Sequence, residues 1–140
     1  MRKVRVALGK ESYDIVIGHG LEEELQAFVR QAGFSRQAML VTDSNVGPLY
    51  GENVRAILEA GGLLVTVVTI PAGESSKSLA VAEKLYTRAI ELGLDRKSPI
   101  FALGGGVVGD LAGFIAATYM RGVPFVQLPT SLLAQVDSSV

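Results

Sequence analysis

The sequence predicts an α/β domain in which a parallel sheet is flanked by helices and preceded by an antiparallel hairpin. Short apolar runs alternate with segments of helical periodicity along most of the chain. The runs lack the polar alternation of half-exposed strands, which is typical of strands buried on both faces. Glycines follow the helical segments, where they act as stop signals. The chain of 140 residues has the length of one domain, so residues 1–140 are assigned to it.

The first elements are a hairpin and a helix. Apolar residues fall at every second position from Val4 to Leu8 and from Tyr13 to Ile17, around a Gly9-Lys10 corner. From Leu21 to Ala32 the period becomes helical. Glutamates at the start of this segment and Gly33 after its end support a helix there.

The remaining elements alternate between strand and helix. Strands are predicted at 38–42, 63–70, 100–103 and 125–128, and helices at 53–60, 79–90 and 107–119. From Leu132 the sequence predicts the start of one more helix that has no C-cap. We therefore expect the sequence to be part of a longer protein.

Composition and charge exclude several functions. Thirteen basic and fourteen acidic residues give a formal net charge of -1, so the chain lacks the cationic surface that nucleic acids and anionic membranes attract. There is no cysteine, and His19 is the single histidine, so no zinc site of cysteines and histidines can form within these residues. No secretory signal or run of membrane-spanning length is recognisable, and we expect a cytoplasmic protein.

The most specific motif is Gly104-Gly105-Gly106-Val107-Val108-Gly109-Asp110, between a predicted buried strand and a predicted helix. Gly104, Gly106 and Gly109 fit the G-x-G-x-x-G pattern of Rossmann-like dinucleotide sites. Glycine lets the backbone turn tightly and lets a pyrophosphate approach the amides and the positive end of the helix. A glycine turn that only allows close helix–strand packing is the alternative.

This motif departs from the common form in two ways. It follows a late strand instead of the first, and no acidic residue lies about 20 residues beyond it to hold a ribose. Asp43 ends an earlier strand, and its carboxylate could accept the ribose hydroxyls because ligands gather at the carboxyl ends of parallel strands. A turn or helix-capping role fits its position equally well.

The segment from Pro71 to Ser78 is another strand-end loop. Ser76 or Ser78 is expected to cap the next helix. Glu74 and Lys77 could hold a hydroxyl and a phosphate, or form a solvated ion pair.

Thr130 and Ser131 follow the last strand and offer hydroxyls to a ligand or to a helix N-terminus. With the other strand-end loops they predict an α/β nucleotide-binding domain. The glycine pattern favours a dinucleotide as the ligand, and the spacing of these residues indicates no reaction.

Three other residues have open roles. Spacing favours Arg121 as a cation at the C-terminus of the apolar helix, with Gly122 as the left-handed stop. Asp137 lies in a largely apolar segment, as a buried cap or as a ligand contact. His19 precedes the first helix and is expected in a turn.

Three segments of the second half closely resemble the 3-dehydroquinate synthase family, and the likeness extends over the whole chain. These are Gly104 to Phe114, Ala117 to Val123 and Gln127 to Val140. Pro71-Ala72-Gly73-Glu74 and Lys77-Ser78 resemble that family's second nucleotide loop. The fold implies a broader relationship to glycerol dehydrogenase and iron-dependent alcohol dehydrogenases, but the Arg121-Gly122 and Ala134 to Ser139 segments favour the synthase.

The resemblance implies an activity and its cofactors. Members of the family convert the sugar phosphate 3-deoxy-D-arabino-heptulosonate 7-phosphate to 3-dehydroquinate and phosphate, in the shikimate pathway of aromatic amino acid biosynthesis. They are lyases that use catalytic NAD and a divalent metal, zinc or cobalt. NAD oxidises a ring hydroxyl so that phosphate can be eliminated, and the ketone is then reduced back. The complete enzyme is expected to be a homodimer.

The resemblance also implies residue roles. It places Asp43 on the adenosine ribose, Gly73, Glu74 and Lys77 on the nucleotide, Gly105, Gly106, Val107, Val108, Gly109 and Asp110 around the pyrophosphate, and Thr130 and Ser131 near the cofactor. Ser131 stands where threonine is more usual. Arg121 resembles an arginine that binds the phosphate of the partner subunit's substrate, and Asp137 resembles a ligand of a substrate hydroxyl.

In the family, the chain continues beyond the position of Val140 into a helical C-terminal domain that supplies the metal ligands. That metal-binding domain is absent from these residues, so we expect them to contain neither a metal ligand nor a complete catalytic site. A polypeptide of these 140 residues is therefore expected to be inactive. The NAD-binding domain of a polyol dehydrogenase and a non-catalytic nucleotide-binding module are the alternatives.

Overall fold

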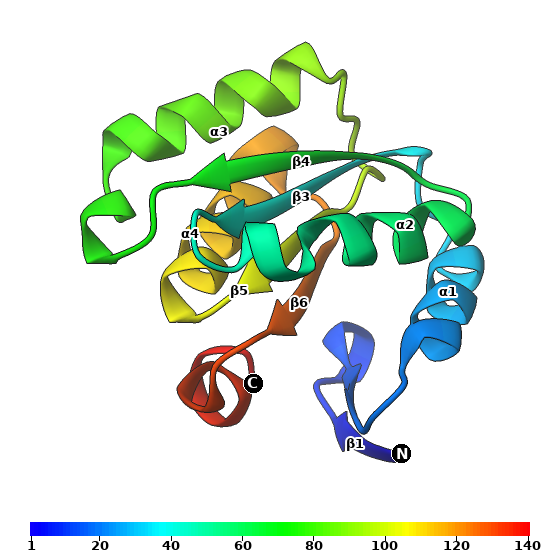
Figure 1. Cartoon of the computed structure of the whole chain (residues 1–140). Helices are drawn as coiled ribbons and strands as arrows, with labels where there is room; N and C mark the ends of the chain where they lie inside the picture. Colours follow the sequence, from blue (N-terminus) through cyan, green and yellow to red (C-terminus); the bar gives the residue numbers. More distant parts are fainter.

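The computed structural model describes every residue from Met1 to Val140. A four-stranded parallel sheet in the order β4-β3-β5-β6 forms its centre, and a separate antiparallel hairpin of β1 and β2 precedes it (Figure 1). The strands are β1 (Arg2–Val6), β2 (Tyr13–Ile17), β3 (Gln37–Asp43), β4 (Leu64–Ile70), β5 (Ile100–Gly104) and β6 (Phe125–Pro129). The predicted class, a parallel sheet with an N-terminal hairpin, is confirmed.

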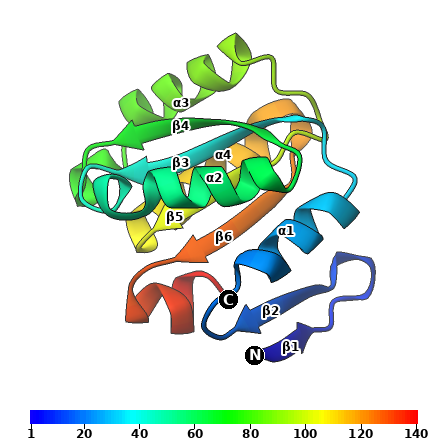
Figure 2. The same ribbon diagram turned by 45° about the vertical axis from the view of Figure 1, so that its right-hand side comes forward.

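Helices cover both faces of the parallel sheet (Figure 2). They are α1 (Glu22–Gln31), α2 (Glu52–Ala60), α3 (Leu79–Glu91) and α4 (Gly106–Thr118). Val29 of α1 and Leu58 of α2 pack in one buried cluster with Leu40 of β3. The other cluster joins α3 and α4 to the opposite face and includes Leu85 and Ile115. The sheet is therefore the middle one of three layers, as Rossmann-like domains require.

Capping residues fix the ends of several helices. Gly33 and Gly93 follow α1 and α3 with φ of 72° and 68°, a left-handed conformation that glycine adopts at little cost. Ser78 caps α3, because its Oγ accepts a hydrogen bond from the Val81 amide at 3.2 Å. The predicted stops at Gly33 and Gly93 are thus confirmed, and of the two serines that were alternatives for the cap of α3, the structure uses Ser78.

Helix α3 buries a narrower stripe than its apolar residues suggest. Ala82, Leu85 and Ala89 are buried, whereas Leu79 is 84% exposed and Ile90 is 67% exposed. The two exposed residues lie near the helix ends, away from the middle of the sheet.

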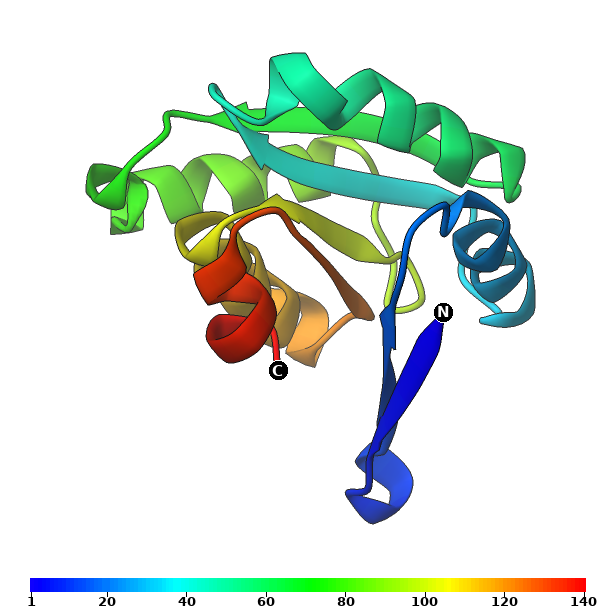
Figure 3. The same ribbon diagram turned by 60° about the horizontal axis from the view of Figure 1, so that its bottom comes forward.

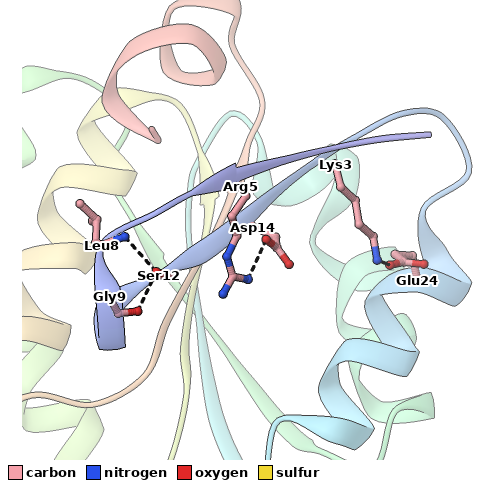
Figure 4. Close-up of polar contacts among 7 residues, drawn as sticks. All are labelled: Lys3, Arg5, Leu8, Gly9, Ser12, Asp14 and Glu24. Carbon is pink, nitrogen blue, oxygen red and sulfur yellow. Dashed lines mark hydrogen bonds and ion pairs between the residues drawn. The ribbon is translucent and has the colours of Figure 1, made fainter.

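The N-terminal hairpin projects from the body of the domain (Figure 3). Arg5 lies opposite Asp14 in the register, and its Nη1 donates to Oδ1 of that carboxylate at 2.9 Å. Lys3 reaches α1, where its Nζ lies 2.8 Å from Oε1 of Glu24 (Figure 4). Both pairs are partly exposed, so they contribute little to stability. Only the Lys3–Glu24 pair joins the hairpin to another element.

Two short turns have π-helical geometry, and the sequence predicts a helix only at the second of them. They are Gly47–Gly51, before α2, and Ala134–Ser138, after β6. The second one occupies the position of the predicted terminal helix. None of the helices has both the length and the apolar character that crossing a bilayer demands.

Candidate functional site

The carboxyl ends of the parallel strands meet at one edge of the sheet. Asp43 is in register with Ile70, and Gly104 with Pro129. From β3 the chain continues to β4 on one side, whereas from β5 it continues to β6 on the other side. Such a switch point between neighbouring strands is where ligands bind in open parallel sheets.

Gly105 and Gly106 form an open start to α4 at this switch point. No side chain caps the helix, and the amides of Gly106, Val107 and Val108 have no acceptor within the protein. A Cβ on Gly105 would lie 3.4 Å from Oγ of Ser131, so a hydroxyl faces the glycine backbone closely. The unpartnered amides and the positive helix end can bind an anion such as a pyrophosphate.

Gly104 and Gly109 are explained by packing. A Cβ on Gly104 would lie 2.7 Å from Cγ2 of Val108, and one on Gly109 would lie 3.1 Å from Oε1 of Gln127. Their missing side chains let α4 approach β5 and β6. The two interpretations of the glycine motif therefore apply to different glycines: these two serve packing, and Gly105 and Gly106 leave the helix start open.

Asp43 fixes the turn that follows β3. Its Oδ1 accepts hydrogen bonds from the amides of Asn45 at 2.9 Å and Val46 at 2.8 Å. The structure therefore shows the turn role that was one of the two alternatives. Its Oδ2 accepts no hydrogen bond from the protein, so that oxygen is available to a ligand hydroxyl.

The β3 and β4 loops are joined by Ser44. Its amide donates to the carbonyl of Ile70 at 3.0 Å, and its Oγ accepts from the amide of Ala72 at 3.0 Å. Ser76 lies deeper in the second loop, where its hydroxyl donates to the carbonyl of Pro71. The segment that carries Glu74 and Lys77 is thereby held against the turn of Asp43.

The second loop also reaches α4. Gly73 has φ of 107°, which favours glycine, and Glu74 beyond it has an 81% exposed side chain. Nζ of Lys77 lies 2.8 Å from Oδ2 of Asp110 and 3.9 Å from Oε2 of Glu74. The hydrogen bond to Asp110 and its negative charge raise the pKa of Lys77 above its ordinary value of 10.5. Four residues predicted at the nucleotide are thus brought to one place.

The end of β6 lies beside the open helix start. The Thr130 amide donates to the carbonyl of Gly104 at 3.0 Å, and Oγ of Ser131 accepts from the Ala134 amide at 3.2 Å. Asp137 lies exposed in the Ala134–Ser138 turn, so the buried-cap interpretation of this residue is wrong.

Arg121 lies at the opposite edge of the sheet, because α4 runs from the end of β5 back to the start of β6. After α4, Met120 and Arg121 have φ of 48° and 65°, and Gly122 has φ of 113°. Gly122 has the positive φ expected of a stop, but its ψ of 130° lies outside the left-handed helical region, and the two residues before it also have positive φ. Consecutive non-glycine residues in this conformation are costly and point to a constraint on this turn.

The structure contains no group of three or more His, Cys, Asp and Glu side chains that could hold a metal ion. His19 lies exposed in the bend between β2 and α1.

Comparison with known proteins decides between the alternatives for the family. The profile described as 3-dehydroquinate synthase N-terminal matches residues 67–140, which is more than half of the chain. The chain belongs to the 3-dehydroquinate synthase family. The matched region begins in β4 and contains Glu74, Lys77, the glycine motif, Arg121 and Asp137.

Curated 3-dehydroquinate synthases also match the part before residue 67. The protein of Symbiobacterium thermophilum is 59% identical over 134 residues, which are 95% of this chain and 37% of that protein. The protein of Desulforamulus reducens is 51% identical over 140 residues, which are 100% of this chain and 39% of that protein. The chain thus spans less than two fifths of the length of these synthases.

Solved structures of sugar-phosphate cyclases share the fold. A 2-deoxy-scyllo-inosose synthase complexed with carbaglucose-6-phosphate, NAD+ and Co2+ matches with a TM-score of 0.90 and 26% identity, over 98% of this chain and 38% of that one. A 2-epi-5-epi-valiolone synthase of Streptomyces hygroscopicus with NAD+ and Zn2+ matches with a TM-score of 0.79 and 30% identity, over 96% and 37%. Glycerol dehydrogenase of Schizosaccharomyces pombe, at 22% identity, a TM-score of 0.56 and coverage of 78% and 25%, shares the fold alone.

Sequence reasoning about this synthase-family chain missed Ser44 and Gly47. In the sequence, Ser44 is only the residue that follows Asp43, and Gly47-Pro48 indicates only a turn. Ser44 matters through its hydrogen bond to Ala72 in another loop, and Gly47 through its close approach to Thr42 in the preceding strand. No spacing along the chain indicates such contacts.

Proposed function

We propose that these residues form the NAD-binding part of a 3-dehydroquinate synthase. The observation that carries this proposal is the open start of α4 at Gly105 and Gly106, next to the turn that presents a free oxygen of Asp43. Anion-binding amides and a ribose-binding carboxylate on neighbouring strands are the parts that a dinucleotide requires. The NAD+ named in two sugar-phosphate cyclase structures supports the same ligand.

The residues at the edge offer NAD free amide donors, a carboxylate oxygen and one lysine. The amides after Gly105 would hold the pyrophosphate, and Asp43 would accept the hydroxyls of the adenosine ribose. Glu74 and Lys77 lie on the connected loop, where they would contact the nucleotide together with Gly73. Thr130 and Ser131 would line the cofactor on the β6 side, since Ser131 faces Gly105.

The proposed reaction is the conversion of 3-deoxy-D-arabino-heptulosonate 7-phosphate to 3-dehydroquinate and phosphate. When bound, NAD supplies the reversible oxidation of a substrate hydroxyl. The part of these residues is to bind and orient the cofactor, with Asp137 contacting a substrate hydroxyl from the same edge. The residues present do not form a metal site, so we assign no step of the reaction to a metal within them.

Arg121 supports a role for a second subunit. It lies at the opposite edge of the sheet from Gly105, so it cannot reach substrate beside this chain's own cofactor loop. We propose that it binds the substrate phosphate of a partner copy, in a homodimer.

Calorimetric titration of NAD into the purified protein tests the proposal. Saturable binding is expected, and a Gly105→Val variant should lose it, because the added side chain would fill the space between residue 105 and Ser131. Gly105 has φ of -82° and ψ of -160°, a conformation that valine adopts readily, so the variant should keep the wild-type circular dichroism spectrum. Absence of NAD binding by the wild-type protein would favour a structural glycine turn in a non-catalytic module.

A further inference from the structure

We infer that Gly47 is a positioning residue for Asp43, and that it acts by letting the turn after β3 lie against the side chain of Thr42. This inference rests on the proposed NAD site, because Asp43 is the residue through which it would affect a ligand. It adds to that site a residue that acts on the carboxylate through the backbone of the turn.

The contact that carries the inference is between Gly47 and Thr42. A Cβ on Gly47 would lie 3.0 Å from Cγ2 of Thr42, closer than side chains normally pack. Thr42 is fully buried in β3 and is in register with Thr69 of β4, so it has little room to move. A side chain at position 47 would therefore displace the turn and leave the strand in place.

Displacing the turn would move the groups that orient Asp43. Gly47 directly follows Val46, whose amide is one of the two donors to Oδ1 of Asp43. Those two hydrogen bonds determine which way the free Oδ2 points. A shift of a few tenths of an ångström at position 47 would thus pass to the carboxylate through one peptide unit.

The hydroxyl of Thr42 takes no part in this contact. Its Oγ1 is buried without a hydrogen-bond partner and would lie 3.8 Å from a Cβ on Gly47, whereas the methyl carbon lies at 3.0 Å. The methyl group alone therefore limits the size of residue 47. Two substitutions of Thr42 should therefore differ in their effect on residue 47. Thr42→Ser removes the methyl group and relieves the contact, whereas Thr42→Val keeps a methyl group there and removes only the hydroxyl.

The backbone of Gly47 itself permits alanine. Gly47 is not among the glycines of positive φ, so Gly47→Ala introduces no left-handed strain. Gly51 ends the same turn and also lacks positive φ, and a Cβ at this position would meet no other atom within 4 Å. Gly51→Ala is therefore a matched control for the loss of glycine in this turn.

NAD titration of these variants tests the inference. Gly47→Ala is expected to weaken NAD binding about three- to tenfold, as partial loss of a charge-assisted hydrogen bond would. Gly51→Ala should bind as the wild-type protein does. The double variant Thr42→Ser/Gly47→Ala should bind NAD with an affinity within about twofold of that of Thr42→Ser alone. The double variant Thr42→Val/Gly47→Ala should bind NAD as weakly as Gly47→Ala does.

A second cycle with Asp43 separates positioning from stability. If Gly47 acts through Asp43, Gly47→Ala should cost no further affinity in an Asp43→Ala background. Circular dichroism melting accompanies each titration. If the Gly47→Ala protein does not fold, the same variants are made in a Thr42→Ser background. In that background Gly47→Ala should leave NAD binding unchanged, and weaker binding would overturn the inference.

The two proposals fail in different ways. A wild-type protein that does not bind NAD would refute the proposed site and this inference with it. Wild-type binding that Gly47→Ala leaves unchanged would refute the inference alone. The inference alone would also be refuted if Gly47→Ala weakened NAD binding equally with and without the Asp43 carboxylate.

Discussion

Nζ of Lys77 lies 2.8 Å from Oδ2 of Asp110, and this contact joins the loop after β4 to the first turns of α4. Both side chains are substantially exposed, so the pair contributes little to the stability of the fold. Its importance is local: it neutralises a carboxylate that lies close to the proposed pyrophosphate position.

Replacement of Lys77 should weaken NAD binding through charge. Lys77→Met leaves the negative charge of Asp110 uncompensated near the open helix start, and we expect a loss of about tenfold in affinity. The loss should shrink as salt is added, because these charges are exposed. Calorimetric titration at low and high ionic strength measures both effects, with Arg55→Met, a paired cation on α2, as the control. Equal affinities for Lys77→Met and the wild-type protein would contradict this role.

The pH dependence of the same pair follows from the raised pKa of Lys77. The folded protein favours the charged ammonium form of Lys77. The contribution of this charge to stability is therefore complete below the ordinary pKa of 10.5 and is lost as pH rises through the higher pKa of the folded protein. NAD affinity should therefore show an alkaline decline that is missing in Lys77→Met. Titrations on either side of that value test this, and an identical decline in both proteins would assign it to another group.

Gly104→Ala should destabilise the domain by about 1–3 kcal/mol, the range for overpacking a well-filled core. The added Cβ would lie 2.7 Å from Cγ2 of Val108, which is itself buried. Adding Val108→Ala should recover part of the loss caused by the glycine substitution. Denaturant unfolding measures the four proteins of this cycle, and strictly additive effects would show that the contact is not the cause.

Met120→Gly should stabilise the fold by about 1 kcal/mol, because it removes the cost of a left-handed conformation in a side-chain-bearing residue. Ala117→Gly, on an exposed position of helical geometry in α4, should instead cost about 1 kcal/mol. Opposite shifts in melting temperature for the same kind of substitution are the expected result. A loss of stability in both variants would mean that the turn is not strained.

Asp95 should contribute to stability against acid. The Ser35 hydroxyl, at 2.7 Å, and the Lys97 amide, at 2.8 Å, donate to its Oδ1, and these hydrogen bonds lower its pKa below the ordinary value of 3.8. The contribution is present above that value and is lost as pH falls through the lower folded one. Unfolding of Asp95→Asn should therefore depend less on pH in this acid range. Glu83→Gln, an exposed carboxylate on α3, should keep the wild-type dependence.

Local sequence patterns were sufficient for the main strands and helices of the fold. The cap at Ser78 and the stops at Gly33 and Gly93 depend on neighbours along the chain, and the structure has all of them. The apolar runs likewise identified strands that are buried on both faces, such as Ile100–Gly104. These features depend on periodicity and backbone conformation, which a sequence expresses directly.

The features that the sequence could not predict depend on tertiary contacts and on unusual backbone conformations. The bond of Lys77 to Asp110 requires the final placement of two elements that are distant along the chain, and the contact of Gly47 with Thr42 requires the exact path of the turn after β3. The left-handed pair Met120 and Arg121 contradicts the usual preference for glycine, so no propensity predicts it. Asp43 lies between these cases: its turn role is visible in the structure, and its ribose role stays a prediction.

Helix α4 connects two places at opposite edges of the sheet. Its 13 residues span about 20 Å, with the open glycine start at one end and the turn of Arg121 at the other. In the proposed homodimer, each copy would therefore contribute the glycine end of this helix to its own site and the Arg121 end to the site of its partner. Substitutions at opposite ends of the helix would then complement each other. A mixed dimer of one copy altered at Gly105 and one copy altered at Arg121 would keep one of its two sites intact.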